Sequence, residues 1–340
     1  MDVPTLRIQA IVATGQGKPA VSPPITPVMS SAAMADLPNP RLPNFFIVGA
    51  QKSGTTSLHH YLGKHPDVFM SAVKEPHFFA HLGRMGEPLP SGLLFSARLV
   101  YTWDDYRKLF ERSDGAVAVG ESSTGYLSSH QAPAAIREHI PHAKIIALLR
   151  HPIDRAYSNY LMNRVHGAEP LRSFEDAFAA EQGRRDAGWP AGKHDYFSLG
   201  LYGEALSRYY AVFPADQIRV FAYEELRDDA KGLVETVFAF LGVEPSQPVD
   251  ASEKLLVAQT PPRSQRIDRL IHSRSRALSV AKSVVPGAVR RSVGARLEAM
   301  NQTPARLPER QRRRMVAAYR DDLSVVDRLT GKNFSRWLEE

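Results

Sequence analysis

The segment Gly49-Ala-Gln-Lys-Ser-Gly-Thr-Thr-Ser57 brings glycines, hydroxyl side chains and one lysine close together. It follows a short apolar run at Asn44–Val48 and precedes a helical pattern at Thr56–Lys64. A glycine-rich turn between a strand and a helix presents backbone N–H groups and the positive end of the helix to an anion. Lys52 adds a compact cation for a phosphate or sulfate oxygen. The sequence therefore predicts a phosphate-binding loop.

The position of the lysine separates this loop from the Walker A pattern G-x-x-x-x-G-K-[ST]. Gly49 and Gly54 have the required separation, but Thr55 occupies the lysine position and Lys52 lies before the second glycine. A kinase of this type would lose its lysine contact to the β- and γ-phosphates, and no predicted strand ends in a clear acid for magnesium. The loop is predicted to hold a phosphate but not a magnesium–triphosphate, and a P-loop kinase is the alternative.

Arg150 and Ser158 form a second candidate anion site. Arg150 directly follows the apolar run Lys144–Leu149, at the end of a predicted strand, where open α/β sheets bind ligands. Ser158 lies about two turns into the predicted helix Ile153–Arg164. A guanidinium supplies a fork of donors and a hydroxyl adds one more, which suits a phosphate. A structural salt bridge is the alternative for Arg150.

Four segments carry a resemblance to a known family: FFIVGAQKSGTTSL, KEPHFF (Lys74 to Phe79), GESSTGYL (Gly120 to Leu127) and LLRHPIDRAYSNY. They resemble the sulfotransferases that use 3′-phosphoadenosine 5′-phosphosulfate (PAPS), in the branch with heparan sulfate sulfotransferases and many bacterial relatives. The similarity continues through SLGLYGEAL, YEEL, FAFLGV and GKNFSRWL, so that it covers about residues 44–338.

The resemblance implies an enzyme of the EC 2.8.2 type with PAPS as co-substrate. It implies that the loop with Lys52 binds the 5′-phosphosulfate, and that Arg150 and Ser158 bind the 3′-phosphate. Sulfuryl transfer needs a base, a cation for the leaving phosphate and aligned binding, and demands no metal. The expected donor-binding residues are Lys52, Ser53, Gly54, Thr55, Thr56, Ser57, Arg150 and Ser158.

The expected catalytic residues are Lys52, for the leaving phosphate, and a base in the segment KEPHFF. Glu75 is the first candidate base, because the resemblance implies that the matching glutamate of the glycan branch removes the acceptor's proton. Partial burial near bound phosphates would raise the pKa of Glu75. His77 is the second candidate, since other branches use histidine. Glu121, a third carboxylate, is expected to be structural or to orient the acceptor.

The chain departs from the heparan sulfate enzymes at two features. Ser122 stands where those enzymes commonly have a lysine, and a chain with no cysteine cannot form their C-terminal disulfide hairpin. Their glycan specificity is therefore not carried over. The absence of cysteine also excludes a disulfide scaffold and thiolate metal sites. Histidines at 59 and 60 and at 77 and 81 are expected to pack and not to bind metal.

The elements that must position these residues alternate between strands and helices. Strands are predicted at residues 44–48, 117–119, 144–149 and 218–222, and helices at 132–139, 153–164, 174–181, 203–213 and 231–241. This alternation predicts an α/β fold of three layers, with a central parallel sheet and a P-loop-like strand–loop–helix. Residues 1–43, with 8 of the 25 prolines, are expected to form a flexible leader. Residues 44–340 are expected to form a single domain with a basic, mostly helical part from residue 250.

The formal net charge of +7 is concentrated near the C-terminus, where residues 263–320 hold 15 Lys and Arg against 3 Asp and Glu. We expect this segment to flank the active site, to contact an anionic membrane peripherally or to be a solvated face. No apolar run reaches the roughly 18–20 residues that cross a bilayer, so the expected location is cytoplasmic.

The expected partner is a small-molecule, glycan or lipid acceptor, with no nucleic acid. Its pocket is expected in the variable loops at residues 82–102 and 164–197. A catalytically inactive module that binds anionic surfaces is the third functional hypothesis, motivated by the arginines at residues 310–314.

Overall fold

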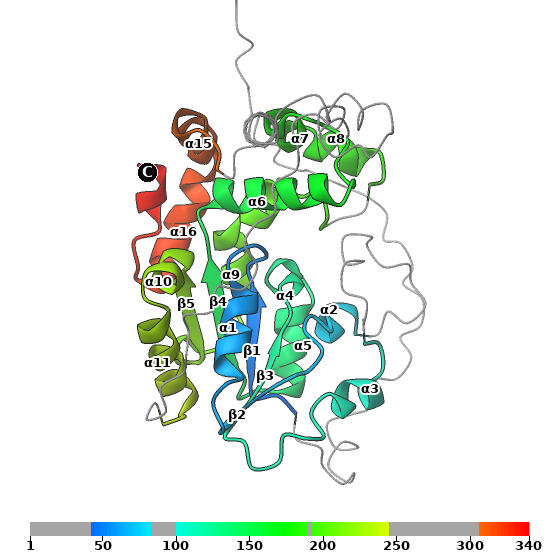
Figure 1. Ribbon diagram of the computed structural model, residues 1–340, viewed down its shortest axis with the longest axis vertical. Coiled ribbons are helices and arrows are strands. Elements are labelled where there is room, and N and C mark those ends of the chain that lie inside the picture. The colour runs from blue at the N-terminus through cyan, green and yellow to red at the C-terminus, as the bar shows by residue number, and fades with distance from the viewer. Residues whose placement is uncertain (1–41, 83–99, 190–191, 245–305, 340) are drawn as a thin grey trace, which may run out of the picture. The chain divides into compact units, whose positions relative to one another are not determined.

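The computed structural model describes residues 42–82, 100–189, 192–244 and 306–339. Five parallel strands in these ranges form one sheet in the order β2-β3-β1-β4-β5 (Figure 1). The strands are β1 (Phe45–Gly49), β2 (Val68–Met70), β3 (Ala118–Ser122), β4 (Lys144–Leu149) and β5 (Ile218–Ala222). Apart from its last two residues, the predicted leader lies outside the described residues.

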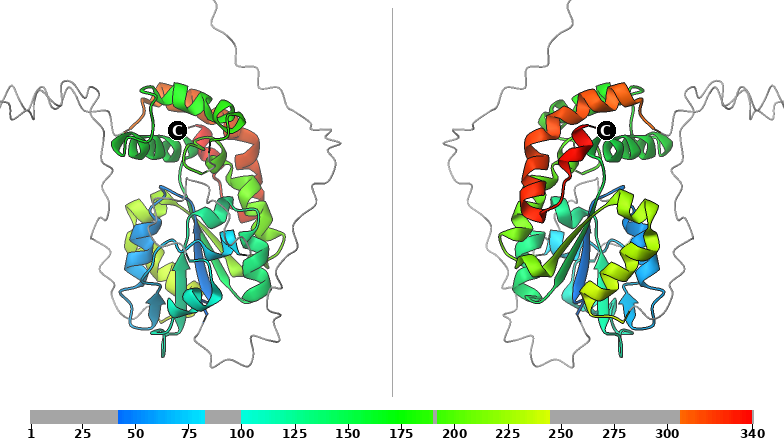
Figure 2. Two further views of the ribbon diagram at one scale, coloured as in Figure 1. Left: turned by 90° about the vertical axis from the view of Figure 1, so that its right-hand side faces the viewer. Right: turned by 90° about the vertical axis from the view of Figure 1, so that its left-hand side faces the viewer.

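Helices cover both faces of the sheet because the strands are apolar on both sides. In β1, Phe45 and Ile47 pack into one core with α1 and α11, whereas Phe46 and Val48 pack into the core on the opposite face. Each of these four side chains is at most 1% exposed. Figure 2 shows the two helical layers on either side of the sheet. The predicted three-layer α/β fold is therefore confirmed.

The described helices before residue 245 fall into three groups by position. One face carries α1 (Thr55–Leu62), α10 (Tyr223–Asp228) and α11 (Ala230–Leu241). The other core includes residues of α2 (Phe78–His81), α3 (Trp103–Lys108), α4 (Gly125–Ser128), α5 (Ala132–His139) and α9 (Tyr202–Tyr210). Beyond the carboxyl ends of β1 and β4 lie α6 (Pro152–Val165), α7 (Phe174–Ala179) and α8 (Glu181–Asp186) (Figure 1).

All four predicted strands are confirmed, with ends that differ by up to three residues. The longer predicted helices are confirmed as α1, α5, α6, α7, α9 and α11. The sequence missed β2, which has only three residues, and the short helices α2, α3, α4, α8 and α10. None of these helices exceeds six residues, so their apolar side chains do not repeat often enough to mark a period.

The C-terminal part ends in α15 (Glu309–Val316) and α16 (Arg320–Thr330). Arg312 lies 3.7 Å from Asp154 at the start of α6, Arg313 pairs with Glu309, and Arg314 pairs with Glu175 of α7. These arginines of α15 therefore serve contacts within the chain. Residues 263–305 of the basic segment lie outside the described residues. Among the helices that are described, none is both long and apolar enough to span a bilayer.

Candidate functional site

The glycine-rich loop connects the end of β1 to the start of α1. Gly54 has a φ of 89°, in the left-handed region that favours glycine, and a Cβ there would lie 2.8 Å from Cδ2 of Leu226 in α10. Glycine is therefore required at this turn both for its conformation and for its packing. The loop is held against the neighbouring strand, since the N–H of Ala50 donates to the carbonyl of Leu148 at 2.7 Å.

Donors at the end of this loop are available to an anion. The N–H of Leu58 donates to the carbonyl of Gly54 at 3.1 Å, so the N–H groups of residues 55–57 precede the first hydrogen bond of the helical ladder. The hydroxyl of Ser53 is buried without a hydrogen-bond partner among the residues that the structure describes. Thr55 is buried, whereas Thr56 and Ser57 are half-buried. This arrangement suits an anion at the start of α1.

Lys52 and Arg150 meet at this loop. A guanidinium N–H of Arg150 donates to the carbonyl of Lys52 at 3.0 Å, and the guanidinium lies 4.8 Å from the ring centroid of Tyr223. The ammonium of Lys52 lies 3.5 Å from Sδ of Met162 in α6. Burial lowers the pKa of Lys52, the charge of Arg150 lowers it further, and Glu75 offsets part of this.

Neither of these two cations has a carboxylate within salt-bridge distance in the described part of the chain. Two adjacent cations without a counter-ion repel each other, so an anion that binds between them relieves this repulsion. Ser158 lies one helical turn before Met162, so the two share a face of α6. The structure therefore brings Lys52 and Arg150 into contact and places Ser158 on the half-buried side of the adjoining helix.

Backbone conformation singles out the predicted catalytic residues. The non-glycine residues with positive φ among those described are Lys52 at 67°, Glu75 at 63° and His77 at 53°. Such conformations are uncommon for residues with a Cβ, and they cluster at functional sites, where the surrounding structure enforces them. The three residues come from two loops that are separate in the sequence. The three residues with this unusual backbone conformation are thus the same three that the sequence predicts to be catalytic.

Glu75 and His77 interact in the loop between β2 and α2. One carboxylate oxygen of Glu75 lies 2.6 Å from Nζ of Lys74, and the other lies 3.3 Å from Nε2 of His77. Burial raises the pKa of Glu75, but the hydrogen bond to His77 and the charge of Lys74 outweigh it and lower the pKa to about 2. These two neighbours, which the sequence argument left out, therefore oppose the rise in pKa that burial alone would cause.

Glu121 has a structural role in the described chain. Its side chain is fully buried, and it accepts hydrogen bonds from the hydroxyls of Tyr106, of Ser123 at 2.5 Å and of Tyr126 at 3.3 Å. Burial raises the pKa of this carboxyl. The Ser123 hydroxyl also accepts a hydrogen bond from the N–H of His77 at 3.1 Å. This network positions the segment KEPHFF that holds the candidate bases. Sequence reasoning missed the network because Tyr106 and His77 meet Glu121 and Ser123 only in the folded chain.

A cavity of about 640 Å³ opens beside Glu75 and His77. Its lining includes Arg185 of α8, Asp195 of the segment that follows α8, and Arg208 of α9. The second predicted acceptor loop therefore contributes to a cavity beside the candidate base. Of the first predicted loop, residues 83–99 lie outside the described residues. A volume of this size is typical of sites for small organic molecules.

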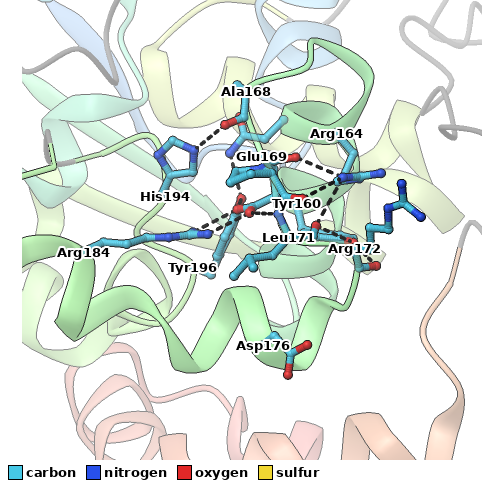
Figure 3. A network of polar contacts seen from close by, with 12 residues as sticks. Tyr160, Arg164, Ala168, Glu169, Leu171, Arg172, Asp176, Arg184, His194 and Tyr196 are labelled. Carbon is cyan, nitrogen blue, oxygen red and sulfur yellow. Dashed lines mark hydrogen bonds and ion pairs between the residues drawn. The ribbon is translucent and has the colours of Figure 1, made fainter. Parts of the chain in front are cut away.

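A buried ion pair holds together the segment that supplies Arg185 to the cavity lining (Figure 3). Arg184 donates two hydrogen bonds to the carboxylate of Glu169, at 2.7 and 2.9 Å, in a geometry that is typical of strong pairs. The hydroxyl of Tyr196 and the N–H of Leu171 donate to the same carboxylate, at 2.7 and 2.8 Å. His194 is bonded to the carbonyl of Ala168 at 3.1 Å. This segment is thus held together by hydrogen bonds among its own residues.

The described residues include no cluster of three or more His, Cys, Asp or Glu side chains that could hold a metal ion. Of the histidines considered as ligand pairs, His59 is half-buried, and burial followed by the charge of Lys74 lowers its pKa to about 4.

These features define an α/β protein with a P-loop-like anion site at the carboxyl edge of a parallel sheet. A family model described as a sulfotransferase domain matches residues 42–275. The chain belongs to this family, and PAPS is the co-substrate typical of its members. The resemblance seen in the sequence is therefore confirmed.

Individual relatives agree with this family. Human heparan sulfate glucosamine 3-O-sulfotransferase 6 is 31% identical over 206 residues, which are 60% of this chain and 53% of that protein. Human bifunctional heparan sulfate N-deacetylase/N-sulfotransferase 2 is 30% identical over 211 residues, which are 60% of this chain and 22% of that protein. The chain thus spans about half or less of the length of these two relatives.

A sulfotransferase crystal structure from Alicyclobacillus acidocaldarius superposes with a TM-score of 0.65 at 28% identity, covering 87% of this chain and 99% of that chain. This superposition covers far more of both chains than the partial matches to the curated relatives, and it supports the three-layer fold described above.

Proposed function

We propose that this protein transfers the sulfuryl group of PAPS to a hydroxyl or amine of an acceptor in the cavity beside Glu75. The observation that carries the proposal is the meeting of Lys52 and Arg150 at the phosphate loop, without a carboxylate partner among the described residues. A donor with phosphates at both its 3′ and 5′ positions supplies the missing negative charge. Membership of the sulfotransferase domain family supports this donor.

The proposed donor site divides between two groups of residues. Lys52, the hydroxyl of Ser53 and the N–H groups at the start of α1 bind the 5′-phosphosulfate. Arg150 and Ser158 bind the 3′-phosphate. Two observations support this division. The Ser53 hydroxyl has no hydrogen-bond partner among the described residues, and Ser158 lies on the face of α6 that contacts Lys52.

The proposed reaction is an in-line displacement at sulfur. The acceptor oxygen or nitrogen forms the new bond to sulfur, the bond from sulfur to the 5′-phosphate oxygen breaks, and the acceptor's proton passes to Glu75. Lys52 stabilises the charge that develops on the leaving phosphate. The Glu75 side chain is 28% exposed and that of His77 only 2%, so the carboxylate is the group that an acceptor reaches. His77 holds this carboxylate in place, and the mechanism uses no metal.

The donor site is tested by calorimetric titration with 3′-phosphoadenosine 5′-phosphate (PAP), the nucleotide product. We expect Lys52→Ala and Arg150→Ala each to weaken binding about tenfold or more, since one charge-assisted hydrogen bond contributes about 1.5–3 kcal/mol. The matched control is Lys231→Ala, whose side chain is 68% exposed on α11. Unchanged PAP affinity in both site variants would contradict the assignment of the donor site to Lys52 and Arg150.

The base is tested by turnover with radiolabelled PAPS. We expect Glu75→Gln to lower kcat by about 10²–10⁴-fold, the usual contribution of general base catalysis, while PAP affinity stays within about threefold. His77→Ala should cost less, because the carboxylate remains. A larger loss for His77→Ala than for Glu75→Gln would exchange the two roles.

A further inference from the structure

The cations of the acceptor cavity differ from those of the donor site, because each has a carboxylate partner. Arg185 lies 3.1 Å from a carboxylate oxygen of Glu181 and 3.3 Å from one of Asp195. It also donates to the hydroxyl of Ser198 at 2.6 Å. The Arg185 charge is therefore already balanced by two acids, and an incoming anion would have to compete with them.

Arg208, the other arginine in the described cavity lining, is balanced in the same way. Its guanidinium donates to Glu204, one helical turn earlier on α9, at 3.0 Å. It also lies within reach of the carbonyls of Leu127 and Ser128, at 3.3 and 3.4 Å. These contacts use the donors of Arg208 to connect α9 with α4. Arg208 thus offers little unbalanced charge to a ligand.

Carboxylates outnumber arginines among the described residues that line the cavity. The lining includes three carboxylates and two arginines: Glu75, Asp195 and Glu204, with Arg185 and Arg208. Glu75 is ionised at neutral pH, since its pKa is about 2. An anionic acceptor would therefore approach a wall whose net charge is not positive. Binding an anion there would cost free energy through like-charge repulsion and incomplete pairing.

The cavity also has an apolar side and a limited size. Leu127, Leu199, Leu201 and Ala205 contribute aliphatic surface. The volume of about 640 Å³ lies within the range of roughly 300–1,000 Å³ that is typical of sites for small organic ligands. A ligand that fills this space is compact, with an apolar part against the leucines and a hydroxyl or amine directed to Glu75.

We propose that the acceptor is a compact hydroxyl or amine compound without negative charge and with an apolar part, and not a polyanionic glycan. This inference rests on the proposed sulfotransferase function and adds the chemical class of its acceptor. The donor site attracts phosphates through Lys52 and Arg150, which have no acid partner in the part of the chain that the structure describes, whereas the acceptor cavity pairs its arginines with acids. The protein thereby keeps a second anion away from the reacting carboxylate.

The test compares matched acceptors that differ in charge, with the full chain and radiolabelled PAPS. One pair is octyl glucoside and octyl glucuronide, and the other is tyramine and 4-hydroxyphenylacetate; heparan sulfate serves as the polyanion. The assay is run at pH 8, above the ordinary histidine pKa of about 6.5. We expect a kcat/KM at least tenfold higher for the uncharged or cationic member of a pair than for its anionic counterpart.

A double variant of the cavity acids tests the effect of charge separately from the effect of acceptor shape. Asp195→Asn with Glu204→Gln leaves Arg185 and Arg208 with fewer acids, so we expect the preference for the non-anionic member to fall about tenfold. The matched control is Glu235→Gln, which removes an acid of another i,i+4 pair, with Lys231 on α11, outside the cavity lining. This control should leave the preference unchanged.

The outcomes separate this inference from the proposed function. Suppose that the protein binds PAP but transfers the label mainly to the anionic members or heparan sulfate, or to none of the five acceptors. The proposed acceptor class is then wrong, and the donor site is unaffected. An unaltered preference in the double variant also overturns the proposed acceptor class. Failure to bind PAP would instead overturn the proposed function itself.

Discussion

At the scale of single residues, Lys74 and His77 determine the charge state of Glu75. Burial alone would raise the pKa of this carboxyl, but its two neighbours lower the pKa to about 2. The carboxylate is therefore fully ionised at neutral pH, ready to accept a proton but weakly basic. Contact with a donor phosphate would shift this balance towards a stronger base, because a nearby negative charge raises a carboxyl pKa.

The pH dependence of stability and of activity follows from the lowered pKa of Glu75. The pKa of folded Glu75 lies below its ordinary value of 4.5, so its ionisation stabilises the fold above about pH 4.5, and that stabilisation is lost as the pH falls towards 2. Lys74→Met removes a cation and should move the pKa back up. We expect the acid limb of kcat/KM to move to higher pH, although the hydrogen bond to His77 keeps part of the lowering. Steady-state profiles measure this.

The control for this prediction is Lys108→Met, which removes the lysine paired with the exposed Asp105 at 2.9 Å. Its acid limb should coincide with that of the unmodified protein. Coincident profiles for Lys74→Met as well would show that Lys74 does not control the base.

At the scale of elements, the predictable part of the site was local in sequence. The phosphate loop and Arg150 could be predicted because each directly follows an apolar strand, and such strand ends gather at one edge of a parallel sheet. The loop at residues 164–197 could be predicted as part of the acceptor pocket, but the pairing of its charged side chains could not. Arg185 comes from the short helix α8, which has no clear period, and it meets Asp195 only through tertiary folding.

The buried ion pair of that loop is open to a stability test. Glu169 and Arg184 have side chains that are 0% and 8% exposed. Removing one partner of a buried pair leaves an uncompensated charge, so we expect Arg184→Met to lower the free energy of unfolding by about 3–5 kcal/mol. Urea denaturation measures the change. Hydrogen exchange should show faster exchange across residues 169–189.

The matched control is Arg313→Met, which breaks a pair of the same chemistry whose side chains are 56% and 65% exposed. An exposed pair contributes about 0–1 kcal/mol, so this variant should remain close to the unmodified protein. Equal losses in the two variants would contradict the assigned role of burial.

At the scale of the whole molecule, the C-terminal helix α16 supports the helix that borders the cavity. The carboxylate of Asp322 accepts hydrogen bonds from the N–H groups of Gly203 and Glu204 at the start of α9, at 2.8 and 3.0 Å. Tyr202, the first residue of α9, donates its hydroxyl to the carbonyl of Arg150 at 2.8 Å. Segments more than a hundred residues apart thus connect the end of the chain to the donor site.

Gly203 makes this connection sensitive to one methyl group. A Cβ at this position would lie 2.3 Å from the carbonyl oxygen of Asp322 and 2.8 Å from Cβ of Val325. Gly203→Ala must therefore push α16 away, and we expect a loss of about 1–3 kcal/mol in the free energy of unfolding. PAP affinity should also fall, because the Tyr202 hydroxyl moves relative to the carbonyl that it holds. Urea denaturation and calorimetric titration measure the two effects.

Gly183 in α8 provides the matched control for this substitution. A Cβ there would meet nothing within 4 Å, and alanine favours a helix over glycine by about 0.5–1 kcal/mol. Gly183→Ala should therefore stabilise the protein and leave PAP affinity unchanged. If Gly203→Ala were as stable as the unmodified protein, close packing of α16 on α9 would not be what holds the C-terminal helix. If it were less stable but bound PAP normally, α16 would not influence the donor site through Tyr202 and Arg150.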